Sequence, residues 1–143
     1  MATGERGGGM SEDAVLARML TEILARETAL FDAYEAALHA ARGRAAREVF
    51  MRGQLGCARS RGRLMAEMER LSVPAAGVRP EVPADPAGLR VAEEAQLAGY
   101  REVGRRAEAM GDARLGRLVA LHIGEHEERR ARLTGLGEDV SGS

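Results

Sequence analysis

All four prolines of the 143-residue chain lie in one short segment, VPAAGVRPEVPADP, between Pro74 and Pro86. Proline lacks a backbone N–H and fixes its φ angle, so such a cluster ends any helix that reaches it. A linker of about 15 residues at ~3.3 Å per residue spans up to ~50 Å, whereas a helix of about 25 residues is only ~38 Å long. The linker can therefore run the whole length of a helix, and it divides the chain into two halves.

Each half shows apolar side chains at three- and four-residue spacing, which predicts amphipathic helices over residues 11–41, 45–71, 89–110 and 115–133. We find no alternation of period two that is long enough for a strand. The inward positions that we expect are Leu16, Leu20, Ile23, Glu27, Leu30, Tyr34, Leu38 and Ala41; Phe50, Gly53, Cys57, Ser60, Leu64, Met68 and Leu71; Leu89, Glu93, Leu97, Tyr100, Val103, Ala107 and Met110; and Leu115, Leu118, His122, Glu125 or His126, Arg129 and Leu133. The sequence therefore predicts an all-α fold, a four-helix bundle of two hairpins joined by one long Pro-rich crossover.

The two ends of the chain differ from the helical segments in composition. MATGERGGGM predicts a flexible Gly-rich arm over residues 1–10, and GLGEDVSGS predicts a disordered tail over residues 135–143. Between them we expect one domain over residues 11–134, with its crossover at 73–88. The first residues lack the apolar stretch of a signal peptide, so the expected location is cytoplasmic.

Composition excludes several classes of function. The formal net charge is −1, and no run of residues is apolar enough to span a membrane. Residues 42–70 carry eight Arg against three Glu, but with two Phe, two Tyr and no Trp in the chain no aromatics interleave them. A single cysteine, Cys57, excludes an intramolecular disulfide, and we interpret it as a small core residue. We therefore expect neither nucleic acid nor membrane as a partner.

The absence of lysine and the many Ala and Gly residues suggest a bacterial source.

A repeated pair of polar residues falls on the apolar stripes. Glu27 precedes Tyr34 by seven residues, and Glu93 precedes Tyr100 by seven residues. A buried carboxylate costs several kcal/mol unless a cation or hydrogen-bond donors compensate it. One glutamate at a matching position in each half therefore suggests two facing carboxylates with pseudo-twofold symmetry, an arrangement that a metal centre in a bundle requires.

On these residues the chain resembles the ferritin-like superfamily, and within it the rubrerythrin-like and small stress-associated bacterial branches. Residues 92–133 carry most of the similarity, and the first half matches mainly through Glu27 and Tyr34. The resemblance implies iron binding with a role in iron or oxidative-stress handling, in a homo-oligomer. It implies Glu27, Glu93, His122 and either Glu125 or His126 as metal ligands, with Tyr34 and Tyr100 as hydrogen-bond donors behind them.

The sequence departs from the di-iron pattern of that family on the second helix of each hairpin, where a Glu-x-x-His motif is expected. The stretch Gln54–Arg63, QLGCARSRGR, has no carboxylate and no histidine. In HIGEHEERR the order is His122-x-x-Glu125, with His126 next.

Three interpretations follow. In the first, a metal site with fewer ligands binds Fe, Mn or Zn through Glu27, Glu93, His122 and either Glu125 or His126. Alternatively, an arginine (Arg59, Arg63 or Arg129) replaces the metal, because a guanidinium can satisfy a carboxylate. In the third interpretation these groups lie at the solvated edges of their helices. The function is accordingly either a metal-binding ferritin-like protein or a metal-free scaffold that dimerises or binds another protein. The sequence does not decide whether the chain is an enzyme.

Overall fold

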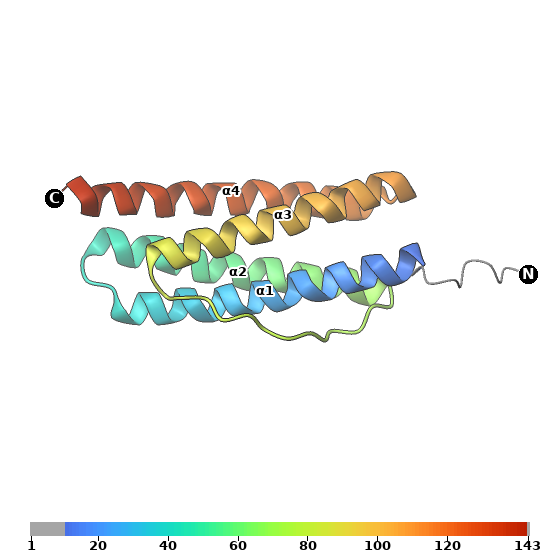
Figure 1. Ribbon diagram of the computed structural model, residues 1–143, viewed down its shortest axis with the longest axis horizontal. Coiled ribbons are helices and arrows are strands. Elements are labelled where there is room, and N and C mark those ends of the chain that lie inside the picture. The colour runs from blue at the N-terminus through green and yellow to red at the C-terminus, as the bar shows by residue number, and fades with distance from the viewer. Residues whose placement is uncertain (1–10, 143) are drawn as a thin grey trace, which may run out of the picture.

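The computed structural model describes residues 11–142, with side chains described through residue 136. It contains four helices, α1 (Glu12–Ala40), α2 (Arg44–Arg70), α3 (Pro86–Met110) and α4 (Ala113–Gly142). Figure 1 shows them aligned along one axis, with α1 and α4 running in one direction and α2 and α3 in the other. The predicted all-α four-helix bundle is confirmed.

Local chemistry sets the ends of the helices. Ser11 caps α1, its hydroxyl oxygen accepting a backbone N–H at 3.1 Å. Asp85 caps α3 in the same way at 2.7 Å, and Pro86 occupies the first helical turn, where its missing N–H costs nothing. Gly111 ends α3 with a left-handed φ of 71°, a conformation that favours glycine.

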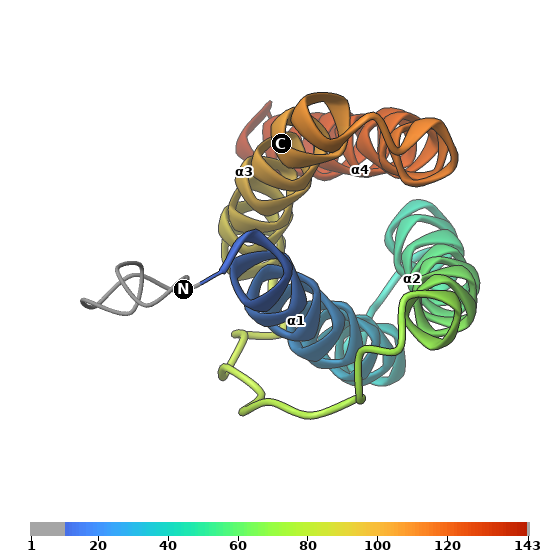
Figure 2. The ribbon, with the colours of Figure 1, turned by 90° about the vertical axis from the view of Figure 1, so that its right-hand side faces the viewer.

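The crossover between α2 and α3 comprises residues 71–85 and contains three of the four prolines. It runs along the outside of α1 from one end of the bundle to the other (Figures 1 and 2). At Gly77, where φ is 128°, a Cβ atom would meet the Thr21 side chain of α1 at 3.1 Å. The crossover therefore lies directly on α1, and it ends earlier than the predicted residue 88 because Asp85 and Pro86 already start the next helix.

Viewed along the bundle, the helices follow the order α2, α1, α3, α4 (Figure 2). Their buried apolar side chains form two clusters. The first comprises Leu16, Leu20, Ile23, Leu24, Leu64, Met68, Tyr100, Val103, Ala107, Leu115 and Val119, and the second comprises Leu30, Ala33, Tyr34, Ala37, Phe50, Cys57, Leu89, Leu133 and Leu136. Between these clusters lies a layer of buried polar side chains, which is the centre of the candidate site.

The helical part of α4 is longer than expected. The sequence predicts a bundle that ends at residue 134 and a disordered tail over 135–143, but α4 continues as helix to Gly142. Leu136 extends the buried stripe of the helix, and the Thr134 hydroxyl donates to the carbonyl of Arg130 at 3.0 Å. The predicted arm at 1–10 lies outside the described residues. Among the described helices, none is long and apolar enough to cross a membrane.

Candidate functional site: a buried ionic network

The repeated Glu–Tyr pairs meet in the middle of the bundle. Glu27 of α1 and Glu93 of α3 are both completely buried. Each tyrosine hydroxyl donates to the glutamate of the other helix, Tyr34 to Glu93 Oε2 at 2.6 Å and Tyr100 to Glu27 Oε2 at 2.7 Å. The seven-residue spacing thus produces two exchanged hydrogen bonds that link α1 to α3.

His126 of α4 lies between these two carboxylates. Its Nε2 is 2.6 Å from Glu27 Oε2, and its Nδ1 contacts Glu93 Oε1. Burial alone would lower the pKa of His126, but attraction and hydrogen bonds from the two carboxylates outweigh burial and raise the pKa to about 9. His126 is therefore protonated at neutral pH, and each ring N–H donates to one carboxylate.

Arg129, one turn further along α4, supplies a second buried cation. Its Nε donates to Glu93 Oε2 at 3.0 Å, and only 7% of the residue is exposed. Nη2 lies 3.0 Å from both ring nitrogens of His126. Because both nitrogens already donate to carboxylates, this is a packing contact and not a hydrogen bond to a ring lone pair.

The two cations balance the two carboxylates. Burial by itself would raise the pKa of Glu27, but attraction to His126, its hydrogen bond and the nearby Arg129 lower that pKa to about 2. An unpaired buried charge is strongly unfavourable, whereas a group of opposite charges with satisfied hydrogen bonds is tolerated. The network of Glu27, Glu93, His126 and Arg129, which we call the ionic network, is thus neutral as a whole.

His122 is buried beside this network and remains neutral. Burial lowers its pKa to about 4, although Glu27 and Glu125 act in the opposite direction. The Tyr100 hydroxyl donates its proton to Glu27, so it accepts from His122 Nδ1 at 2.9 Å. This assigns the proton to Nδ1 and leaves Nε2 with a free lone pair. Nε2 and Glu27 Oε1 are both buried and find no hydrogen-bond partner within the described part of the chain.

Helix α2 faces the site with small side chains. Gly53, Gly56, Cys57 and Ser60 are all buried there. A Cβ atom on Gly53 would come within 2.3 Å of the Tyr34 ring, and one on Gly56 within 2.4 Å of Arg129 Nη1. The glycines therefore make room for side chains from α1 and α4. Cys57 fills the core as predicted, and burial raises the pKa of its thiol well above the usual value.

The remaining predicted and unpredicted polar residues lie around this centre. Glu125 lies outside the ionic network and accepts a hydrogen bond from Arg63 at 3.1 Å. Sequence reasoning assigned no role to Gln96, which is completely buried and donates to the carbonyl of Ile23 at 2.9 Å. Gln96 also accepts from Arg26 at 3.0 Å, which ties α3 to α1. Its position three residues after Glu93, on the same helix face, was the available signal.

The residues present do not fit a two-iron centre. Between Gln54 and Arg63, α2 carries no carboxylate and no histidine. The space that a ligand from this helix would need is filled by Arg129, whose Nη1 lies over Gly56. Within residues 11–136, no group of three or more His, Cys, Asp and Glu side chains is arranged to hold a metal ion.

Comparison with known proteins supports the fold. The sequence matches no protein-family model, and no curated protein matches it. A solved structure described as "ferritin like, diiron-carboxylate proteins" from Bacillus anthracis str. Ames superposes with a TM-score of 0.81 at 16% sequence identity. The match covers 89% of this chain and 99% of the other. The resemblance noted in the sequence is thereby confirmed at the level of architecture: this chain has the ferritin-like fold.

Proposed function

We propose that this chain is a metal-independent ferritin-like scaffold that acts as a binding module and not as an iron enzyme. The observation that carries the proposal is the position of Arg129, whose Nε donates to the buried Glu93 while its guanidinium extends over Gly56 of α2. In this interpretation, Arg129 and protonated His126 neutralise the carboxylates that a metal would otherwise hold. A partner-binding role, as a homo-oligomer or with another protein, is the use that such a scaffold would serve.

The buried charges support a core in which arginine and histidine neutralise the carboxylates, rather than one that has become apolar. Glu27 and Glu93 would be costly in a core that contained no cation, and selection for a merely apolar interior would replace them. Arg129 is one of three arginines that the sequence offered as a substitute for the metal. The other two lie elsewhere: Arg63 pairs with Glu125, and Arg59 is exposed. Of these three arginines, only Arg129 of α4 donates a hydrogen bond to a glutamate of the core.

Iron binding, with a role in iron or oxidative-stress handling, is the second candidate function. It is supported by the convergence of Glu27, Glu93, His122 and His126, and by the buried lone pairs on Glu27 Oε1 and His122 Nε2. The similar structure from B. anthracis, which is described as a diiron-carboxylate protein, is consistent with this candidate. One bound ion would require His126 to lose its proton and Arg129 to leave Glu93, so binding would compete with the ionic network.

Metal content separates the two candidates. We would purify the chain without an affinity tag and measure iron, manganese and zinc by elemental mass spectrometry, before and after reconstitution. The metal-independent scaffold predicts metal well below one equivalent and the same unfolding midpoint with chelator or with added metal. Near-stoichiometric iron or manganese that is lost in the Glu27→Ala/Glu93→Ala variant, but kept in Glu125→Ala, would overturn it. Glu125→Ala is the matched control because Glu125 pairs with Arg63 outside the ionic network.

A further inference from the structure

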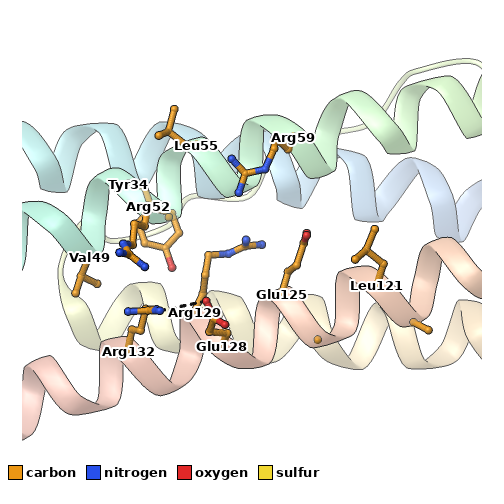
Figure 3. A pocket seen from close by; sticks show the side chains of 13 residues that line it. Tyr34, Val49, Arg52, Leu55, Arg59, Leu121, Glu125, Glu128, Arg129 and Arg132 are labelled. Carbon is orange, nitrogen blue, oxygen red and sulfur yellow. Dashed lines mark hydrogen bonds and ion pairs between the residues drawn. The ribbon is translucent and has the colours of Figure 1, made fainter.

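A solvent-open groove of about 520 Å³ separates α2 from α4 beside the ionic network (Figure 3). Its size falls within the roughly 300–1,000 Å³ of small-molecule sites. Small residues on both helices hollow it out, Gly53 on α2 and Ala120 and Gly124 on α4. Gly53 therefore both admits the Tyr34 ring to the core and helps to form the groove.

Positive charge is concentrated along this groove. Arg52, Arg59, Arg129 and Arg132 line it, against two carboxylates, Glu125 and Glu128. Three of the surrounding ion pairs are already made: Arg52 with Glu48 at 3.1 Å, Arg132 with Glu128 at 3.3 Å, and Arg63 with Glu125 at 3.1 Å. These pairs neutralise both lining carboxylates and two of the four lining arginines.

Two guanidinium groups keep donors available to the groove. In Figure 3, Arg59 extends from α2 toward α4, and Arg129 extends from α4 toward α2. No described side chain forms an ion pair or hydrogen bond with Arg59. Arg129 uses Nε for Glu93 and Nη2 against His126, while its Nη1 lies over Gly56, and the residue itself lines the groove. An anion between Arg59 and Arg129 Nη1 would receive charge-assisted hydrogen bonds from both helices.

Apolar side chains line the same groove. Val49 and Leu55 of α2 and Leu121 of α4 contribute to its walls. Leu55 and Leu121 are 53% and 48% exposed, so a ligand could still cover much of their apolar surface. The groove thus combines free guanidinium donors with an aliphatic wall. This combination suits a ligand with an anionic head group and an aliphatic body better than an inorganic ion.

We propose that the groove between α2 and α4 binds a small amphipathic anion, a carboxylate or phosphate head group on a short aliphatic body. The head group lies between Arg59 and Arg129, and the aliphatic body extends along the groove toward Leu121 (Figure 3). Ligand binding there goes beyond the metal-independent core and is tested separately: metal content examines the ionic network, and anion titration examines the groove. A groove that bound no anion would leave the proposed core intact.

Isothermal titration calorimetry with four probes tests the proposal. Octyl phosphate and octanoate carry both features, octanol lacks the charge, and inorganic phosphate lacks the aliphatic body. We expect saturable one-to-one binding of at least one of the first two, with octanol and inorganic phosphate at least tenfold weaker. The tighter of octyl phosphate and octanoate identifies the head group. Equal affinity for octanol or inorganic phosphate, or no saturable binding of either anion, would overturn the proposal.

A pair of variants localises the bound anion. Arg59→Ala removes an exposed, unpaired guanidinium, so the fold should persist while the affinity falls at least tenfold. Arg117→Ala removes the same charge from an exposed position of α4 outside the groove, and we expect less than a twofold change. Equal loss in both variants would mean that only the overall charge matters, which contradicts a site in the groove.

Light scattering under the same conditions tests the alternative that a second copy of the chain covers the groove. If the ligand-free chain is a dimer whose groove is covered, Leu121→Arg should dissociate it, and octyl phosphate should fail to bind the wild type. That combination would replace the ligand site with an interface between copies. Octyl phosphate binding with no change in molar mass agrees with a small-molecule site.

Discussion

Helices α1 and α3 each place a glutamate and a tyrosine seven residues apart in the core, whereas α2 and α4 face the same space with very different side chains. The Tyr34–Glu93 and Tyr100–Glu27 hydrogen bonds, at 2.6 and 2.7 Å, are nearly equivalent. Opposite them, α4 contributes two histidines and an arginine, and α2 contributes glycine, cysteine and serine. Only the first helix of each hairpin therefore retains the pseudo-twofold symmetry.

The difference has a steric and an electrostatic part. Without side chains on Gly53 and Gly56, α2 provides space but no charge. Tyr34 of α1 fills the space at Gly53, and Arg129 of the neighbouring helix α4 fills the space at Gly56 and also neutralises Glu93. Two cations of α4 thus neutralise the two buried carboxylates, and no charged side chain of α2 is needed for this.

The largest expected effect comes from removing that cation. Arg129→Met keeps similar volume but leaves the buried Glu93 without its guanidinium, and loss of one partner of a buried ion pair costs about 3–5 kcal/mol. Urea denaturation followed by circular dichroism measures the free energy of unfolding. Arg117→Met, at an exposed position of the same helix, serves as the control and should change it by less than about 0.5 kcal/mol. If Arg129→Met lowered the free energy of unfolding by less than about 1 kcal/mol, Glu93 would not need the guanidinium of α4 for its neutralisation.

A second test uses pH to remove the other cation of α4. The pKa of His126 is about 9 in the folded chain and about 6.5 when unfolded, so its stabilising contribution is complete below about pH 6.5 and is lost as pH rises through 9. We expect unfolding experiments between pH 6.5 and 10 to record a decline of up to about 3 kcal/mol. The chain has no lysine, and the pKa values of both its tyrosines are raised, so few other groups titrate in this range.

His126→Gln is the matched variant for the alkaline decline, which it should abolish. At acidic pH, the titration of His122 changes the free energy of unfolding in the opposite direction. Its folded pKa of about 4 lies below the unfolded value, so stability falls as pH decreases from about 6.5 to 4. A wild-type profile that stays flat from pH 7 to 10 would contradict a protonated His126 between the carboxylates.

The smallest expected effect concerns the space that α2 leaves. Alanine in place of a helical glycine ordinarily stabilises by about 1 kcal/mol. Gly62→Ala should do so, because its Cβ meets nothing within 4 Å. Gly53→Ala should instead destabilise by about 1–3 kcal/mol, since its Cβ would overlap the Tyr34 ring, which the hydrogen bond to Glu93 holds in place. Thermal unfolding midpoints of the two variants give the comparison, and a rise in both would mean that Tyr34 has room to move.

Much of the fold was predictable because its causes are local. Helical periodicity gave all four helices, and the proline cluster located the crossover, since both depend on spacing and backbone chemistry. The end of α4 was missed because Gly135 and Gly137 suggested a break, whereas Leu136 adds to the buried stripe. Packing against the core thus outweighed a weak local preference.

For the candidate site, the sequence by itself determined which residues share a face: Glu27 with Tyr34, Glu93 with Tyr100, and His122 with His126. This follows from the 3.6-residue period of the helix. Only the tertiary structure decided that each tyrosine bonds the glutamate of the other helix, that Glu125 pairs with Arg63, and that Arg129 neutralises Glu93. These choices depend on the distances and rotations between helices, which a period within one helix does not specify.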